Sequence, residues 1–269
     1  MKSEARGLIL KDILARRYLL AQFTSRDFTS RYRGTYLGLV WSVLMPLVMV
    51  AMYTFVFGSI FKSRWGGGGD SSLFFAAALF AGLIPFNLFC DVLISSASLL
   101  NSNSNLVKKV VFPLEILPLS RTLASFGHAL VGLLVLAVLA GSQGTVGATW
   151  LYLPLIYVPF FMLCLGVSFL VSALAVFFRD INHLLGAVVS LCLFLSPIFY
   201  SMDAVPDSIR PIMTFNPLAI IAEQCRRIAI FGGAPQVGAV TILWGWALLI
   251  IAGGLWCFRK LKNSFADVM

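Results

Sequence analysis

The chain has 269 residues, of which 59% are hydrophobic and only 12% are charged. Soluble domains are about half apolar and about a quarter charged, so this composition excludes an ordinary water-soluble globular protein. The formal net charge is +9. A nucleic-acid-binding protein would carry that charge on a soluble basic face, which this sequence lacks, so no nucleic-acid partner is expected.

Segments that can cross a membrane are the long intervals without Asp, Glu, Lys or Arg, because a helix needs about 20 apolar residues to cross about 30 Å of hydrocarbon. The longest interval is interrupted by turn-forming residues at 141–147, which divide it into two spans. The sequence therefore predicts an all-α polytopic membrane protein with a six-helix transmembrane domain over residues 34–258. The predicted spans cover residues 36–61, 73–97, 119–140, 151–178, 184–200 and 238–258.

The distribution of the 20 Lys and Arg residues predicts the orientation. Six spans place both termini on one side of the membrane, and fifteen of the 20 basic residues fall on that side. Because cytoplasmic loops carry the excess of Lys and Arg, both termini are expected in the cytoplasm. Contact with anionic lipid headgroups then accounts for the net positive charge.

Residues 1–33 are predicted to form a cytoplasmic amphipathic segment at the membrane interface. Charged and apolar residues alternate there, as in helices that lie on a membrane surface. The segment lacks the apolar region of a cleavable signal peptide, so the first span is expected to act as its own insertion signal. A plain basic tail is the alternative. Residues 259–269 are expected to form a second cytoplasmic tail.

Residues 101–113, between the second and third spans, are first polar, then basic, then apolar. Asn and Ser are favoured helix N-caps, and helices tend to end before the residue that precedes proline. A short helix is therefore predicted to begin near Asn103 or Asn105 and to end before Pro113. An ordinary basic loop is the alternative.

Residues 201–237, on the outer side, are too many for a turn and too apolar for a solvated loop. Asn216 followed by Pro217 matches an N-cap with proline at the first helical position, which predicts a helix over residues 218–231. Together with residues 206–209, this predicts two short amphipathic re-entrant helices that dip into the outer interface. They could cap a pathway or simply anchor the fifth and sixth spans.

Motifs for nucleotide binding and for catalysis are absent from the sequence. A phosphate-binding loop needs G-x-x-x-x-G-K-[ST], whereas the one glycine cluster, at residues 66–69, is followed by Asp70. H-E-x-x-H, G-x-S-x-G and closely paired carboxylates are also missing, and the five cysteines show no C-x-x-C spacing. The chain is expected to be no enzyme and to bind no nucleotide, metal or other cofactor itself.

Asp91 and His128 are the ionisable side chains within the predicted spans. A charged Asp at a helix centre costs roughly 2.5–3.5 kcal/mol on insertion scales, so such a residue usually faces the protein interior or water. A functional role and a structural, hydrogen-bonded role for Asp91 are both open. Many aromatic residues also fall in the spans, where they either pack against lipid and helices or line a pathway.

Four stretches of the chain contain motifs that point to a protein family. The first is R-D-F-T-S-R-Y-R-G-T-Y-L-G-L-V-W-S-V-L-M-P at residues 26–46. The others are N-L-V-K-K-V-V-F-P-L-E-I-L-P at 105–118, F-R-D-I at 178–181, and S-P-I-F-Y at 196–200 leading to F-N-P-L at 215–218. In this order they extend over nearly the whole chain, and together they resemble the permease subunits of ABC exporters for polysaccharides, the type-2 class.

The resemblance implies a subunit of six helices that works as a homodimer with two copies of a separate ATPase subunit. That partner would bind ATP and Mg²⁺. This chain would move a lipid-linked glycan, such as O-antigen, capsule or teichoic acid, across the bacterial inner membrane. Closure of the ATPase dimer would displace a coupling segment of this chain and shift its spans between a closed and an open pathway.

By position, the resemblance implies roles for four groups of residues. The ATPase-coupling segment would comprise Asn105, Leu106, Val107, Lys108, Lys109, Val110 and Phe112. Substrate-pathway candidates, whose aromatic faces would suit the C–H faces of sugars, are Trp41, Tyr53, Phe57, Asp91, Phe199 and Tyr200. Outer-gate candidates are Pro206, Ile209, Asn216, Pro217, Arg226 and Arg227. Residues 8–23 would match the interfacial helix of the family, and the residues of the interfacial entry to the first span would be Arg26, Asp27, Arg31, Tyr32 and Arg33.

Three alternatives are distinguishable from this interpretation. A permease for drugs or small lipids would have a similar topology, and only the four stretches speak for glycans. A membrane-embedded enzyme of lipid-linked glycan metabolism would need a cluster of Asp, Glu, His or Arg near one interface, and the sequence has only scattered examples. A passive channel would leave the coupling segment unexplained.

Overall fold

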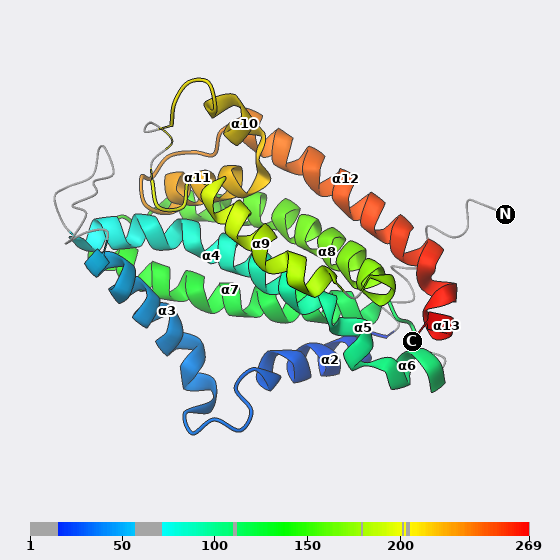
Figure 1. Ribbon diagram of the computed structural model, residues 1–269. Coiled ribbons are helices and arrows are strands. Elements are labelled where there is room, and N and C mark those ends of the chain that lie inside the picture. Colours follow the sequence, from blue (N-terminus) through cyan, green and yellow to red (C-terminus); the bar gives the residue numbers. More distant parts are fainter. Residues whose placement is uncertain are drawn as a thin grey trace.

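The computed structural model describes residues 16–56, 72–109, 112–178, 180–200, 202 and 205–268, and within these ranges the chain forms helices and turns but no strand (Figure 1). Five helical segments are long and apolar enough to cross a membrane. The predicted all-α, membrane-spanning class is therefore confirmed. These segments are Gly38–Val56, Leu73–Ala97, Ile116–Ser142, Ala148–Phe177 and Val237–Ser264.

The long helices are α2 (Arg17–Ser30), α3 (Trp41–Tyr53), α4 (Ser72–Ala97), α7 (Ile116–Ser142), α8 (Leu153–Phe177), α9 (Ile181–Phe194), α11 (Pro217–Ala229) and α12 (Val237–Leu261). The short ones are α5 (Leu99–Ser102), α6 (Ser104–Lys109), α10 (Arg210–Phe215) and α13 (Phe265–Val268). Single 3-10 turns are η1 (Gly38–Val40), η3 (Ala148–Tyr152) and η5 (Lys262–Ser264). The two ends of the bundle are called the α6 end and the α11 end.

The predicted fifth span, residues 184–200, is not confirmed as a single membrane-length helix. Helix α9 has 14 residues and ends at Phe194. At about 1.5 Å per residue it is about 21 Å long, short of the roughly 30 Å hydrocarbon core. Pro197 explains the break, because proline has no backbone N–H and disfavours helical geometry in the residue before it. Residues 195–200 continue as turns and bends.

Helix α4 is the centre of the bundle, and Figure 1 shows it surrounded by α7, α8 and α9. Its side chains are buried almost continuously from Phe75 to Val92. Near its last turns, the buried hydroxyls of Ser96 and Ser168 are hydrogen-bonded at 2.8 Å and join α4 to α8. Such pairs hold helices together where the bilayer itself supplies no hydrophobic force between them.

Helices α8 and α12 lie side by side along most of their lengths (Figure 1). Their backbones touch where Gly166 of α8 faces Gly254 of α12, and a Cβ on either glycine would overlap the backbone of the opposite helix. Small residues allow this close approach in membrane proteins.

Helix α3 packs loosely against α4 and α7. Val50 is its one buried residue, and Figure 1 shows the helix leaving the bundle at an angle. Its exposed side chains are apolar, among them Leu47, Val48 and Met52. This helix therefore presents an apolar face that lipid or another chain can cover.

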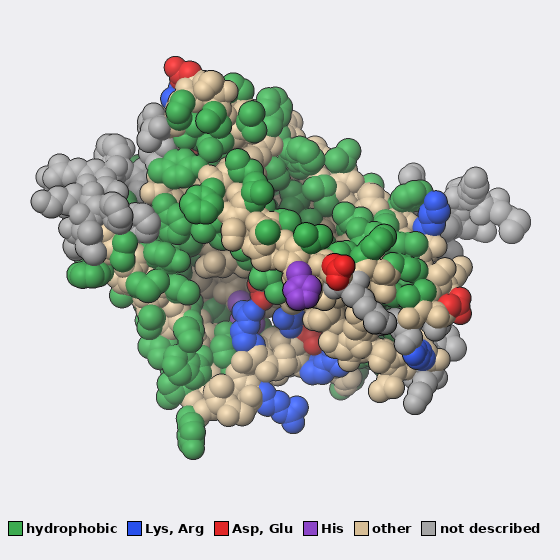
Figure 2. Space-filling model, in the orientation of Figure 1, with side chains coloured by type: hydrophobic (Ala, Val, Ile, Leu, Met, Phe, Trp, Pro, Cys, Tyr) green, Lys and Arg blue, Asp and Glu red, His purple; other side chains and the backbone are tan. Residues whose placement is uncertain are grey.

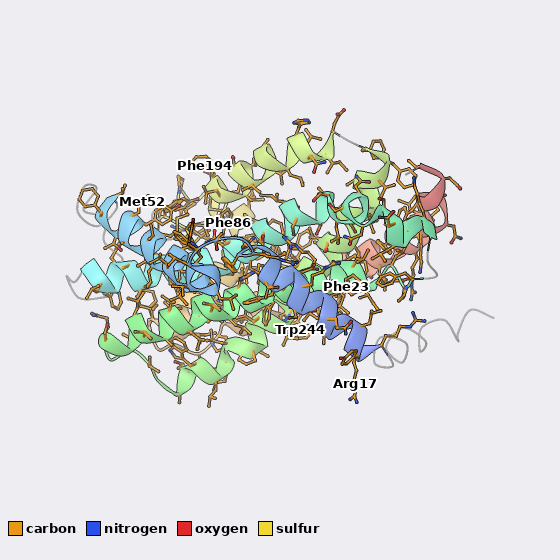
Figure 3. The ribbon with its side chains drawn as sticks, turned by 90° about the horizontal axis from the view of Figure 1, so that it is seen from below. Arg17, Phe23, Met52, Phe86, Phe194 and Trp244 are labelled. Carbon is orange, nitrogen blue, oxygen red and sulfur yellow. The ribbon has the colours of Figure 1, made fainter. Side chains whose placement is uncertain are left out.

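Helix α2 packs along the first turns of α7. Ser120 of α7 donates a hydrogen bond of 3.2 Å to Asp27, and the Phe28 ring stacks on His128 with 4.3 Å between centroids. Figure 3 shows Arg17 extending away from the bundle at the start of α2, while Phe23 lies closer to it. The predicted N-terminal helix is thus present from residue 17, attached to the bundle, and residues 8–15 of that prediction lie outside the described part.

Candidate functional site

A polar cavity of about 260 Å³ lies between α3, α4 and α7. Its apolar walls come from side chains such as Met45, Pro46 and Leu83, while its polar groups come from all three helices and the preceding bend. Figure 2 shows charged and His side chains gathered in a hollow between apolar surfaces on this face. The polar lining residues are Arg31, Tyr32, Ser42, Asn87, Asp91, Ser125 and His128.

Asp91 is held in this cavity by two partners. Arg31, from the bend after α2, forms an ion pair with it, and Ser125 of α7 donates a hydrogen bond of 2.7 Å to its second carboxylate oxygen. Its side chain is 17% exposed and that of Arg31 is 42% exposed, so the pair lies at the mouth of the cavity. The predicted intramembrane carboxylate is therefore paired and hydrogen-bonded, as the cost of an isolated charge in a membrane requires.

Tyr32 and His128 form the neighbouring polar contact. The phenol oxygen of Tyr32 lies 3.4 Å from His128 Nδ1, and the two rings meet edge to face. Burial raises the pKa of the Tyr32 phenol above its ordinary value, so the group stays neutral at physiological pH. A neutral phenol, an imidazole and a guanidinium therefore line the same opening.

The predicted interfacial residues separate into different environments. Arg31 and Tyr32 line the cavity. Asp27 is 8% exposed and fastens α2 to Ser120, which makes it structural. Arg26 pairs with Asp27 at 3.0 Å, and Arg33 lies exposed in the bend.

Two of the predicted pathway aromatics, Tyr53 and Phe199, meet near the α11 end, and Tyr200 follows Phe199 in the chain. The rings of Tyr53 and Phe199 are 5.3 Å apart, and the Tyr200 hydroxyl donates a 2.8 Å hydrogen bond to the carbonyl of Phe194. Figure 3 shows Met52 and Phe194 near the same end of the molecule. Trp41 lies at the other end of α3, about 18 Å along the helix at about 1.5 Å per residue. Asp91 belongs to the cavity, and Phe57 lies outside the described residues.

The predicted N-cap of the second outer helix is confirmed. Asn216 accepts a hydrogen bond of 2.9 Å from the backbone N–H of Leu218, and Pro217 occupies the first position of α11. The Asn216 side chain also donates to the carbonyl of Leu195, at 2.9 Å. One side chain therefore caps α11 and ties it to the chain that follows α9.

Arg226 is fully buried at the centre of this α11 end. Its guanidinium donates to the carbonyl oxygens of Ala78 at 2.9 Å, Pro197 at 2.6 Å and Ile198 at 2.7 Å. Burial lowers the pKa of Arg226 to about 10, so it keeps its charge at neutral pH. A Cβ at Gly82 would overlap the guanidinium, which is why glycine suits that position.

The environment of α11 leaves the predicted pair of re-entrant helices unconfirmed. The sequence predicts two short helices that dip into the outer interface, but α11 is buried along most of its length against α4, α8 and α12. Among the other gate candidates, Pro206 and Ile209 are exposed beside α10, and Arg227 donates to the carbonyl of Ala234 at 2.7 Å. Only the part around α10 thus has the exposure expected of an interfacial element.

The predicted coupling segment contains a short helix, α6, that begins at Ser104, between the two predicted starting points. Leu106, Val107 and Phe112 pack against a buried apolar cluster formed mainly by α8, with further residues from α5, α7, α12 and α13. Asn105 and Lys108 are exposed on the opposite face. The side chain of Lys109, and Val110 altogether, lie outside the description.

Sequence reasoning missed several residues of the cavity. Ser125 and Asn87 were not considered, although Ser125 precedes His128 by three positions and so shares its helix face. That spacing was the available signal. Arg31 and Asp91 were both candidates but in separate groups, because nothing local predicts contact across 60 residues of chain.

These elements define a multi-pass membrane protein with a polar cavity between its spans. Residues 18–229 match the family model described as ABC-2 type transporter, and the chain belongs to that family. The resemblance seen in the four stretches is thereby confirmed.

Relatives align over nearly the full length. The chain is 29% identical to the O-antigen export system permease protein RfbA of Klebsiella pneumoniae, over 93% of this chain and 95% of the relative. It is 23% identical to the O-antigen export system permease protein RfbA of Myxococcus xanthus, over 96% and 98% of the two chains. It is 21% identical to the polysialic acid transport protein KpsM of Escherichia coli, over 89% and 92%.

Proposed function

We propose that this chain is the membrane-spanning subunit of an ABC exporter that moves a lipid-linked polysaccharide across the bacterial inner membrane. The observation that carries the proposal is the full-length alignment with permeases named for O-antigen export and for polysialic acid transport. O-antigen and polysialic acid are both polysaccharides, so the shared cargo class is the glycan rather than a drug.

The power would come from a separate ATPase subunit, which binds ATP and Mg²⁺ in place of this chain. Helix α6 suits the joint with that subunit, because Leu106 and Val107 anchor it inward while Asn105 and Lys108 face outward. A helix with one anchored face and one free face can sit in a groove of a partner. ATP would act by binding the two conformations of the assembly with different affinity.

The cavity beside Arg31 suits the phosphate end of the lipid-linked substrate. Arg31 is partly exposed at its mouth and carries the planar guanidinium that pairs well with phosphate oxygens. A phosphate would compete with Asp91 for this cation. The glycan would then pass towards Tyr53, Phe199 and Tyr200, whose flat rings suit the C–H faces of sugars.

The assembly would be a homodimer with six membrane crossings in each subunit and both termini in the cytoplasm. Helix α9 together with the bends over residues 195–200 would make the crossing that α9 alone is too short for. The exposed apolar residues of α3 and of α9, such as Leu184, Val188 and Leu191, lie free for a second copy.

A deletion strain tests the function. Loss of this chain should abolish surface polysaccharide and leave lipid-linked glycan on the cytoplasmic leaflet. Re-expression of the chain should restore export only together with an ATPase subunit whose nucleotide site is intact. Normal surface polysaccharide in the deletion strain would contradict the proposal.

A further inference from the structure

Residues 262–268, here called the hook, fold back against the α6 end of the bundle. After α12, the chain makes the turn η5 and then the four-residue helix α13. Figure 1 shows α13 beside α6. An isolated helix of this length is unstable in water, so its conformation depends on what it packs against.

Phe265 is the apolar anchor of the hook. It is fully buried, with its ring 5.4 Å from that of Phe258 on α12 and 6.1 Å from that of Phe177 at the end of α8. Three aromatic rings from α8, α12 and α13 therefore meet in one contact.

Lys262 is the polar anchor. Its ammonium group lies 2.8 and 2.9 Å from the two carboxylate oxygens of Glu115, the residue that precedes α7. The Glu115 side chain is 18% exposed and that of Lys262 is 33% exposed, so the pair is partly shielded from water. This ion pair joins the end of α12 to the start of α7, three residues after Phe112 of the coupling segment.

The same apolar cluster also receives α6. Leu106 and Val107 of α6 and Phe112 after it pack against the cluster that contains Phe258 and Phe265. Helix α13 contacts both α6 and α8. The inner face of α6 therefore rests on the apolar cluster to which the hook contributes Phe265.

We infer that the hook is a positioning element of the ATPase joint, in which Phe265 and Lys262 link α6 to the last span so that a displacement of α6 reaches α12. The covalent chain connects α6 only to α4 and α7, through short segments. The hook adds a third connection. Because α12 and α8 touch through their backbones at Gly166 and Gly254, a force that reaches α12 also moves α8.

The inference rests on the proposed function, and it assigns the hook a role distinct from ATPase docking. Asn105 and Lys108 face outward from α6, whereas Phe265 and Lys262 lie behind it. Loss of the hook contacts should therefore leave the ATPase subunit bound and hydrolysing ATP, while less glycan is exported for each ATP hydrolysed. The matching observable is the number of glycans exported per ATP hydrolysed.

The test uses the full complex of this chain and its ATPase subunit, reconstituted in vesicles with lipid-linked glycan. The variants are Phe265→Ala, Lys262→Gln, Glu115→Gln and the charge exchange Lys262→Glu with Glu115→Lys. Val268→Ala is the matched control, because Val268 lies on the same helix but is 46% exposed. We expect the three single variants to keep the ATPase bound while export per ATP falls at least threefold, and the charge exchange to recover at least half of that loss.

A merely structural role would lower yield or thermal stability and leave export per ATP unchanged in the complex that remains. Wild-type export per ATP in Lys262→Gln and Glu115→Gln would therefore overturn the inference. This holds even if Phe265→Ala does not fold. If the wild-type complex itself exports no glycan, the proposed function fails. If the wild type exports and the hook variants match it, only the hook inference fails.

Discussion

Arg226 shows how one side chain can fix the geometry of a broken helix. Pro197 interrupts the chain after α9 and leaves backbone carbonyls without intrahelical donors. Arg226 supplies three N–H groups, two to the carbonyls at residues 197 and 198 and one to Ala78 of α4. A guanidinium suits this position because its donors form a rigid planar fork.

Replacing Arg226 with Lys should therefore destabilise the protein markedly. An ammonium group at the end of a flexible chain cannot reach all three carbonyls, and hydrogen bonds to charged groups contribute about 1.5–3 kcal/mol each. We expect a loss of about 2–4 kcal/mol, seen as a lower unfolding midpoint of the detergent-solubilised protein. Gly82→Ala should have a comparable effect, because its new Cβ would displace the guanidinium.

Arg227→Lys is the control for this prediction. Arg227 follows Arg226 in the sequence and lies partly exposed. It donates a hydrogen bond of 2.7 Å to the carbonyl of Ala234, which an ammonium group can also make. Its midpoint should stay close to wild type. Equal midpoints for Arg226→Lys and Arg227→Lys would mean that the buried fork is dispensable.

At the scale of elements, the α8 and α12 pair depends on two glycines. Gly254→Ala places a Cβ against the carbonyl of Gly166, so the two backbones must move apart. Overpacking of this kind typically costs about 1–3 kcal/mol. The variant should unfold at a lower temperature and export less glycan in cells, because the packing that holds the last span is disturbed.

Gly253→Ala provides a matched comparison one residue away. A Cβ at Gly253 meets nothing within 4 Å, so the change should be neutral or stabilise the helix by up to about 1 kcal/mol. Indistinguishable stability of the two alanine variants would show that α8 and α12 do not need their close contact.

Elements could be predicted from the sequence where they depend on residues that are close together in the chain. A membrane helix must be long and apolar, which fixed the span at residues 73–97 almost to the residue. The Asn216 cap is likewise a contact within three residues of chain. The fifth span is not confirmed as one helix, because hydropathy does not register the missing N–H of Pro197. The burial of α11 could not be predicted, because a charged, amphipathic helix has the sequence of a surface element and the partners of Arg226 are distant in the chain.

At the scale of the whole molecule, the site depends on contacts between distant parts of the chain. Asp91 could be nominated from the cost of a charge in a membrane, but its partners Arg31 and Ser125 come from two other elements. The inward face of α6 and the role of Phe265 also depend on where α8 and α12 end. Such pairings follow from the arrangement of helices, which one sequence does not specify locally.

The arrangement of all crossings can be tested by cysteine labelling. Asp207, before α10, and Lys108, on α6, are exposed at opposite ends of the bundle. In a variant without native cysteines, Asp207→Cys should react with a membrane-impermeant maleimide in intact spheroplasts, and Lys108→Cys should react only after the membrane is opened. This outcome follows if the short α9 and the bends after it complete a crossing.

Asn263→Cys extends the test to the far end of the chain. This residue is exposed in η5, within the hook, and six crossings place it on the same side as Lys108. It should therefore share the protection of Lys108→Cys. With five crossings the chain would enter α12 from the cytoplasm, so Asp207→Cys would be protected and Asn263→Cys would be labelled from outside. Six crossings predict labelling of Asp207→Cys and protection of Asn263→Cys, and five crossings predict the reverse. One experiment therefore decides whether α9 crosses the membrane.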